Sequence, residues 1–176
     1  MKNDNRTDET IIYQGNVFYM IHTDVDIKGE KYPRDIIRHP GGVAILLIQD
    51  RKILFVKQMR HAINKETLEI PAGKMHYGED PYDCAYRELN EETGYTCKEL
   101  KLIQSIVTTP GFCDERIYIY EAVEPSISSH RLSMDEDEDI DTIWIDMDKA
   151  YQMIVNGEID DAKTVCAVYY AIINRK

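Results

Sequence analysis

The sequence predicts an α+β fold in which a mixed β-sheet is accompanied by a few separated helices. Short apolar segments with strand-like patterns recur between residues 17 and 145, whereas helical periodicity is confined to residues 81–93, 148–155 and 162–173. With 176 residues, of which 43% are hydrophobic, the chain is long enough to bury the core of one domain. We therefore expect one main domain with a small appendage.

The appendage comes first in the chain. Apolar side chains alternate over residues 17–27, which is the period of a half-buried strand, and residues 28–30 are typical of a turn. We expect an antiparallel N-terminal β appendage over residues 1–40. Residues 41–176 would then form the main domain.

The strands of the main domain follow. Residues 42–48 form a continuous apolar run, typical of a buried strand, and residues 53–56 give its neighbour across a polar turn. Further strands are predicted at residues 102–107, 117–123 and 142–145.

The most informative segment runs from Gly73 to Gly94 and predicts a loop followed by a helix. Pro81 suits the first turn of a helix, where a missing N–H costs nothing, and Gly94 suits the left-handed residue that ends one. Ala85 and Leu89 recur one turn apart and would face a core. The helix is therefore expected to have one buried, apolar side.

Acidic residues occupy another side of this helix. Glu88 and Glu92, four residues apart, project together with Glu91 beside them, and like charges at this spacing weaken a bare helix by roughly 0.2–0.5 kcal/mol. A bound cation would relieve the repulsion, and carboxylate oxygens suit Mg²⁺ or Mn²⁺. Arg87 would orient these carboxylates through forked hydrogen bonds. A solvated acidic helix face is the alternative interpretation.

Composition narrows the function classes. A net charge of −11 disfavours nonspecific binding to nucleic acid or anionic membranes, because both would be repelled. Five histidines and four cysteines are scattered without paired ligand spacing, which disfavours zinc. The N-terminus is polar and no apolar run reaches the roughly 18 residues of a membrane span, so a reduced cytoplasm is expected.

The segment resembles the Nudix box, G-x5-E-x7-R-E-U-x-E-E-x-G-U with U aliphatic. It matches at each fixed residue, and the one departure is the aromatic Tyr95 at a packing position that is usually aliphatic. The resemblance implies an α/β/α sandwich that hydrolyses a nucleoside diphosphate linked to another moiety, with Mg²⁺ or Mn²⁺ bound by the helix glutamates. The residues expected to support the box are Gly73, Glu79, Arg87 and Gly94.

Flanking motifs narrow the resemblance to the bacterial ADP-ribose pyrophosphatase subfamily. Residues 58–60, 69–74 and 109–112 carry it, and residues 38–43 and 161–164 also resemble bacterial members. The resemblance implies cleavage of ADP-ribose to AMP and ribose 5-phosphate. Hydrolysis of another nucleoside diphosphate sugar and a non-catalytic ADP-ribose sensor are the alternatives.

Carried over position by position, the resemblance implies roles for individual residues. The acidic run at residues 135–139 matches a catalytic loop of the family, in which Glu136 falls at the position of the general base. The neighbouring acids of the run are nearly equivalent candidates, and a solvated charge run is the alternative interpretation. Glu115 is the reserve candidate for the base, and Glu91 is a further catalytic candidate. The expected metal ligands are the backbone carbonyl of Ala72 and the side chains of Glu88, Glu92 and Glu138.

The resemblance also implies substrate contacts and a partner. Arg60 would contact a substrate phosphate, and Arg34 would be contributed by a second subunit, although either could instead form a surface ion pair. Because this subfamily exchanges N-terminal strands between two subunits, a homodimer is expected. The remaining expected substrate contacts are Phe18 and Tyr19, one of which could instead be core, and Pro110, Gly111, Phe112 and Glu115.

Overall fold

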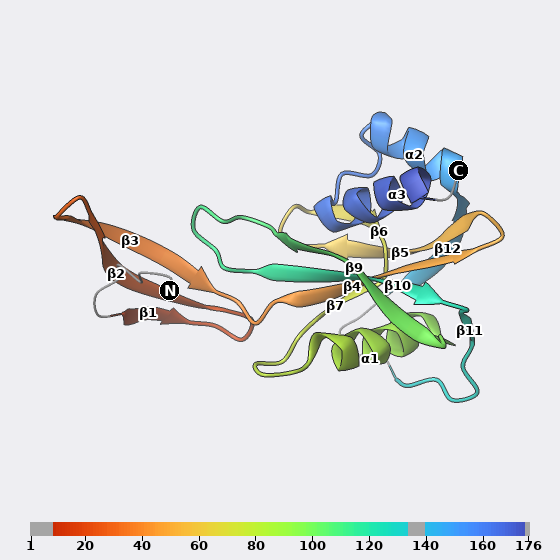
Figure 1. The fold of residues 1–176 in the computed structure, drawn as a ribbon, viewed down its shortest axis with the longest axis horizontal. Coiled ribbons are helices and arrows are strands. Elements are labelled where there is room, and N and C mark those ends of the chain that lie inside the picture. The colour runs from red at the N-terminus through yellow and green to blue at the C-terminus, as the bar shows by residue number, and fades with distance from the viewer. Residues whose placement is uncertain (1–8, 134–139, 175–176) are drawn as a thin grey trace. The chain divides into compact units, whose positions relative to one another are not determined.

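The structure is a computed structural model that describes residues 9–133 and 140–174. The chain folds into two compact units (Figure 1). The N-terminal unit contains the described residues up to Gly41 together with Val107–Arg116. The main unit contains Gly42–Ile106 and the described residues from Ile117 onward. Residues 107–116 thus belong with the N-terminal unit, although they lie far along the chain.

The N-terminal unit is built on an antiparallel sheet of three strands, in the order β1-β2-β3. The strands are β1 (Thr10–Gln14), β2 (Tyr19–Ile27) and β3 (Glu30–Arg38). Between β2 and β3, Lys28 and Gly29 both have positive φ, 57° and 87°, which allows the tight turn that joins them. The predicted antiparallel sheet is confirmed. The strand β1, whose residues are all exposed, was not predicted.

The main unit contains a mixed sheet of seven strands. The central strand β4 (Gly42–Gln49) runs parallel to β10 (Arg116–Val123) and antiparallel to β5 (Lys52–Arg60), as expected for a mixed sheet. The other members are β12 (Asp141–Asp146) beside β5, β9 (Glu99–Val107) beside β10, β6 (Lys65–Glu69) on β5 and β7 (Ala72–Lys74) on β4. A separate pair joins β8 (Tyr95–Thr96) and β11 (Ser126–Ile127).

Helices cover both faces of this sheet. The helix α1 (Pro81–Thr93) lies on one face, and α2 (Met147–Val155) and α3 (Ala162–Asn174) lie on the other (Figure 1). This arrangement confirms the predicted α/β/α sandwich. Among the described residues, no helix has the length and apolarity needed to span a bilayer.

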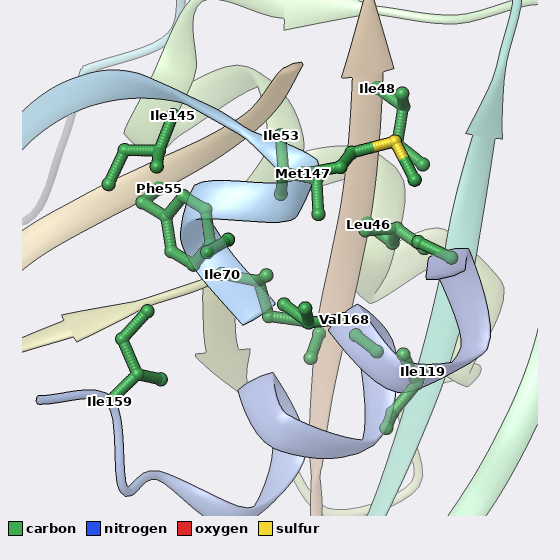
Figure 2. Packing of buried hydrophobic residues seen from close by; sticks show 14 residues of the cluster. Leu46, Ile48, Ile53, Phe55, Ile70, Ile119, Ile145, Met147, Ile159 and Val168 are labelled. Carbon is green, nitrogen blue, oxygen red and sulfur yellow. The ribbon is translucent and has the colours of Figure 1, made fainter. Parts of the chain in front are cut away.

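The strand β4 explains why the sandwich has two cores. Its side chains alternate: Leu46 and Ile48 pack with α2 and α3, as Figure 2 shows around Val168 of α3, while Ile45 and Leu47 pack with α1. All four are buried, so the run of consecutive apolar residues reflects a strand covered on both faces.

The helix α1 begins and ends as its sequence predicted. The side chain of Asp80 accepts a hydrogen bond from the Tyr82 N–H at 2.8 Å, and Pro81 opens the first turn. At the other end Gly94 has a φ of 72°, and its N–H donates to the Asn90 carbonyl at 2.8 Å. The helix therefore has fixed ends, and its acidic side chains have fixed positions along it.

Candidate active site

The site begins where β7 passes α1. At Gly73 an added Cβ would lie 1.9 Å from Cδ of Glu88 and 2.1 Å from its Oε1. No side chain can occupy that position while Glu88 stays in place. The glycine therefore allows the buried Glu88 carboxylate to approach the strand backbone directly.

The carboxylate of Glu92 lies one turn further along α1 and also meets β7. Its Oε2 accepts a hydrogen bond from the Ala72 N–H at 2.9 Å, and the side chain is 1% exposed. In an antiparallel strand the N–H and C=O of one residue point to the same edge. The Ala72 carbonyl therefore points to the same side of β7 as its N–H, which donates to Glu92.

Arg87 connects the remaining acids of the segment. Its Nη1 donates to Glu88 at 2.7 Å and to Glu91 at 2.8 Å, and its Nη2 lies 3.3 Å from Glu79. Glu79 in turn accepts the His76 N–H at 2.8 Å, which ties the preceding loop to the helix. Burial on its own lowers the pKa of the guanidinium, but Glu88 and Glu91 outweigh it and raise the pKa above its ordinary value. Arg87 is thus a permanently charged anchor.

The donor set suits a hard divalent cation. The Arg87 guanidinium pairs with three carboxylates, and the buried Glu92 carboxylate lies one turn further along α1. Buried anions are costly unless they are compensated. Glu88, Glu92 and the Ala72 carbonyl offer only oxygen, which Mg²⁺ and Mn²⁺ prefer. Within residues 9–133 and 140–174, no three acidic, histidine or cysteine side chains are gathered as a ready-made cation site. The predicted ligand Glu138 and the predicted base Glu136 lie outside the described residues.

Arg60 lies at the end of β5 and is held by a carboxylate of β6. Its Nε and Nη2 donate to the two oxygens of Glu69 at 2.7 and 2.6 Å. Burial raises the pKa of the Glu69 carboxyl, but Arg60 and Lys163 outweigh that effect and bring the pKa down to about 2. This ion pair is the alternative that the sequence left open for Arg60, but the side chain remains 41% exposed and can still meet a ligand.

Gln58 shares the α1 side of the sheet with Arg60. Along β5, Leu54 packs in the α1 core and Phe55 in the opposite one, so the even-numbered residues face α1. The amide Nε2 of Gln58 is buried and has no hydrogen-bond partner within the described part of the chain. Sequence reasoning gave this residue no role, although it lies in the motif at residues 58–60.

The other expected substrate contacts belong to the N-terminal unit. Residues 107–116 join the end of β3, where the Ile37 N–H donates to the Phe112 carbonyl at 2.7 Å and the Arg38 guanidinium to Asp114 at 3.0 Å. Pro110 and Phe112 line a hollow of about 350 Å³ there. It is completed by Ile36, Arg38, Val107, Gly111, Cys113, Asp114 and Arg116.

Glu115 is held by a hydrogen bond from Thr108 within this unit. Its Oε2 accepts a hydrogen bond from the Thr108 hydroxyl at 2.7 Å. Its Oε1 lies 3.4 Å from Nδ1 of His39, a nitrogen that itself accepts the Gly41 N–H at 3.0 Å. His39 had no predicted role, and only its place in the motif at residues 38–43 pointed to it. The carboxylate is therefore oriented before any ligand binds.

Phe18, Tyr19 and Arg34 also lie in the N-terminal unit. The Phe18 ring packs 5.8 Å from the ring of Tyr13, and both Phe18 and Tyr19 are half-buried. Arg34 is exposed, and within the part of the chain that the structure describes it donates to the neighbouring Pro33 carbonyl at 2.8 Å. Their roles toward substrate stay predictions.

Residues 38–168 match the family model described as the NUDIX domain. The chain belongs to the Nudix family. The recognition made from the box is thus confirmed, and the roles expected for Gly73, Glu79, Arg87 and Glu92 within it stay predictions.

Several relatives cover most of the chain. It is 44% identical to the methanol dehydrogenase activator of Bacillus methanolicus and 40% identical to the ADP-ribose pyrophosphatase of Bacillus subtilis, each over 161 residues that cover 90% of this chain and 87% of the relative. It is 30% identical to the GDP-mannose pyrophosphatase of Salmonella paratyphi B over 151 residues, 80% of this chain and 78% of the relative.

A solved structure described as an ADP compounds hydrolase has the same fold. It matches with a TM-score of 0.80 at 18% identity and covers 93% of this chain and 89% of that one.

The Gly73 contact gives a test of the Nudix site. We expect Gly73→Ala to weaken Mn²⁺ binding roughly 10- to 100-fold, because the new Cβ must displace the Glu88 carboxylate. Titration with Mn²⁺ followed by electron paramagnetic resonance measures this, and circular dichroism checks the fold. Gly157→Ala is the control, since its Cβ would meet nothing within 4 Å and only its φ of 75° is disturbed. Unchanged Mn²⁺ affinity in Gly73→Ala would contradict the assignment.

Proposed function

We propose that this protein hydrolyses the pyrophosphate bond of ADP-ribose in a metal-dependent reaction, giving AMP and ribose 5-phosphate. The observation that carries the proposal is the complete Nudix box, whose glutamates meet the backbone of β7 at Ala72 and Gly73. Support for the substrate comes from the 40% identity to an ADP-ribose pyrophosphatase over most of the chain.

Glu88, Glu92 and the Ala72 carbonyl would hold Mg²⁺, or Mn²⁺ in its place. When bound, such a cation neutralises phosphate oxygens and makes a water more acidic. The protein's own side chains supply two further functions. Arg60 orients a phosphate, and a carboxylate accepts the proton of the attacking water. We assign the role of proton acceptor to Glu136. Glu115 is the reserve candidate for this base, and Glu91 is a further catalytic candidate.

The substrate's other groups would meet the N-terminal unit. Phe18 or Tyr19 offers an aromatic face to adenine, and residues 110–112 approach the ligand beside Glu115. Gln58, two residues before Arg60, would add one more donor, because its buried Nε2 gains a partner if a ligand oxygen lies beside it. Arg34 would act in the site of a second subunit.

Of the two alternatives, one has specific support. Another nucleoside diphosphate sugar is favoured by the relative named GDP-mannose pyrophosphatase. A sensor that binds ADP-ribose without cleaving it could dispense with the metal-binding acids, whereas this chain keeps every acid of the box. Hydrolysis is therefore the better explanation of the site.

A substrate panel tests the function. We expect ADP-ribose to give a kcat/KM at least about tenfold above GDP-mannose, dinucleoside polyphosphates and deoxynucleoside triphosphates in Mg²⁺, a gap that one well-placed specific contact can supply. Release of AMP and ribose 5-phosphate is measured by chromatography. If ADP-ribose were among the poorest substrates, the proposal would be rejected. Tight binding without turnover would favour the sensor.

Two matched substitutions separate the metal ligand from the base. We expect Glu92→Gln to weaken Mn²⁺ binding roughly 10- to 100-fold, because the amide removes one ligand charge while keeping its shape. Glu136→Gln should keep Mn²⁺ affinity but lower kcat roughly 10²- to 10⁴-fold. Glu124→Gln, at an exposed carboxylate paired with Lys98, controls for the loss of one negative charge. Full activity in Glu136→Gln would move the base role to Glu115.

We further propose a homodimer in which the N-terminal strands are exchanged. The exposed apolar side chains of the N-terminal sheet support this, since Ile11 and Tyr13 are 59% and 52% exposed. Light scattering should give about twice the 20.5 kDa of the chain. A fully active monomer in dilute solution would refute the dimer. We place the protein in the cytoplasm, where its four free cysteines would stay reduced.

A further inference from the structure

A buried carboxylate of β6 receives four hydrogen bonds. Oε1 of Glu69 accepts from Nε of Arg60 and from the Thr67 hydroxyl, both at 2.7 Å. Oε2 accepts from Nη2 of Arg60 at 2.6 Å and from Nζ of Lys163. A carboxylate has about four acceptor positions, so this one is saturated. The orientation of the Glu69 carboxylate is therefore fixed by hydrogen bonds to both of its oxygens.

Lys163 reaches this carboxylate from the first turn of α3. Its side chain is 8% exposed, and Nζ is also 3.0 Å from Oδ1 of Asp161. The other oxygen of Asp161 accepts from the Thr164 N–H at 3.0 Å and from its hydroxyl at 2.6 Å. Because Thr164 also accepts the Ile70 N–H at 3.0 Å, the start of α3 is tied to the segment that leads into β7.

The arrangement leaves one edge of Arg60 open. Glu69 takes Nε and Nη2, and Nη1 has no hydrogen-bond partner among residues 9–133 and 140–174. A guanidinium is planar, so fixing two of its nitrogens fixes where the third points. Since the Arg60 side chain is 41% exposed, it would sample other rotamers if Glu69 were free to turn.

We propose that Lys163 is a positioning residue that, through Glu69, aims the open edge of Arg60 at a phosphate of a nucleoside diphosphate ligand. The proposal rests on the proposed function, because it assigns Arg60 to phosphate binding at that site. Lys163 and Thr67 each hold one oxygen of Glu69, so that Arg60 receives the carboxylate in one orientation. Substrate affinity then depends on a side chain that touches no substrate.

The test compares variants of the full chain. Lys163→Met removes the charge and keeps the length, and we expect it to raise the Kd of ADP roughly tenfold in EDTA, the size of one lost hydrogen bond to a charged group. Isothermal titration calorimetry measures this without metal or turnover. The KM for ADP-ribose should rise similarly, with kcat within about threefold and Mn²⁺ affinity unchanged. Arg60→Met is the reference for complete loss of the contact.

Thr67 gives a second, milder perturbation of the same carboxylate. Thr67→Val should raise the Kd of ADP in the same direction, whereas Thr67→Ser, which keeps the hydroxyl, should bind as the wild type does. Lys65→Met is the matched control, because Lys65 pairs with Asp160 at 2.9 Å in an exposed ion pair nearby. It should change neither ADP binding nor KM.

Failure of the positioning role and failure of the proposed function give different results in these experiments. A folded Lys163→Met protein with the wild-type Kd for ADP would overturn the positioning role, as would an unchanged Kd in Arg60→Met. If Lys163→Met does not fold, Thr67→Val decides, and unchanged ADP binding there overturns the proposal. Failure of the wild type to cleave ADP-ribose would reject the proposed function alone, because ADP binding in EDTA requires no hydrolysis.

Discussion

The structure depends on placing two buried carboxylates directly against the backbone of a short strand. Glu88 and Glu92 project from α1 toward β7, where a glycine leaves room for one and an N–H binds the other. Burying anions without compensation is unfavourable, and Arg87 pairs with three acids of the segment, Glu79, Glu88 and Glu91. A divalent cation at the oxygens of Glu88 and Glu92 would add positive charge beside these buried acids, and this links the box to divalent-cation chemistry.

The sandwich supports this contact by pairing β7 with its central strand. Its Ala72 and Gly73 pair with Ala44 and Val43 of β4, the strand that is buried on both faces. The preceding Pro71 carbonyl accepts the Ile45 N–H at 2.8 Å. The residues that would present the Ala72 carbonyl to a metal are thus paired with the most buried strand of the sheet, as a preorganised site requires.

The sequence was sufficient to predict those elements whose ends and buried faces are determined by residues close together in the chain. The ends of α1 depend on Pro81 and Gly94, and its core side on Ala85 and Leu89, so sequence was sufficient. In contrast, β6 and β7 are short and carry polar residues or glycine, and they become strands only through pairing with β5 and β4. The contact of Lys163 with Glu69 joins residues 94 positions apart, and no local pattern encodes such a distance. The roles of Glu136 and Glu138 stay predictions.

The box alone does not identify the substrate, because the residues proposed to contact the sugar and the base lie outside the box. Every box residue lies in the main unit, whereas residues 107–116 pair with the end of β3 through Ile37 and Arg38. The cation site needs only a diphosphate, which all candidate substrates share. Discrimination between them must then come from groups that meet the sugar and the base. In this chain the groups proposed for that role, Glu115 and the hollow beside Phe112, belong to the N-terminal unit, so the proposed substrate contacts can vary independently of the box residues.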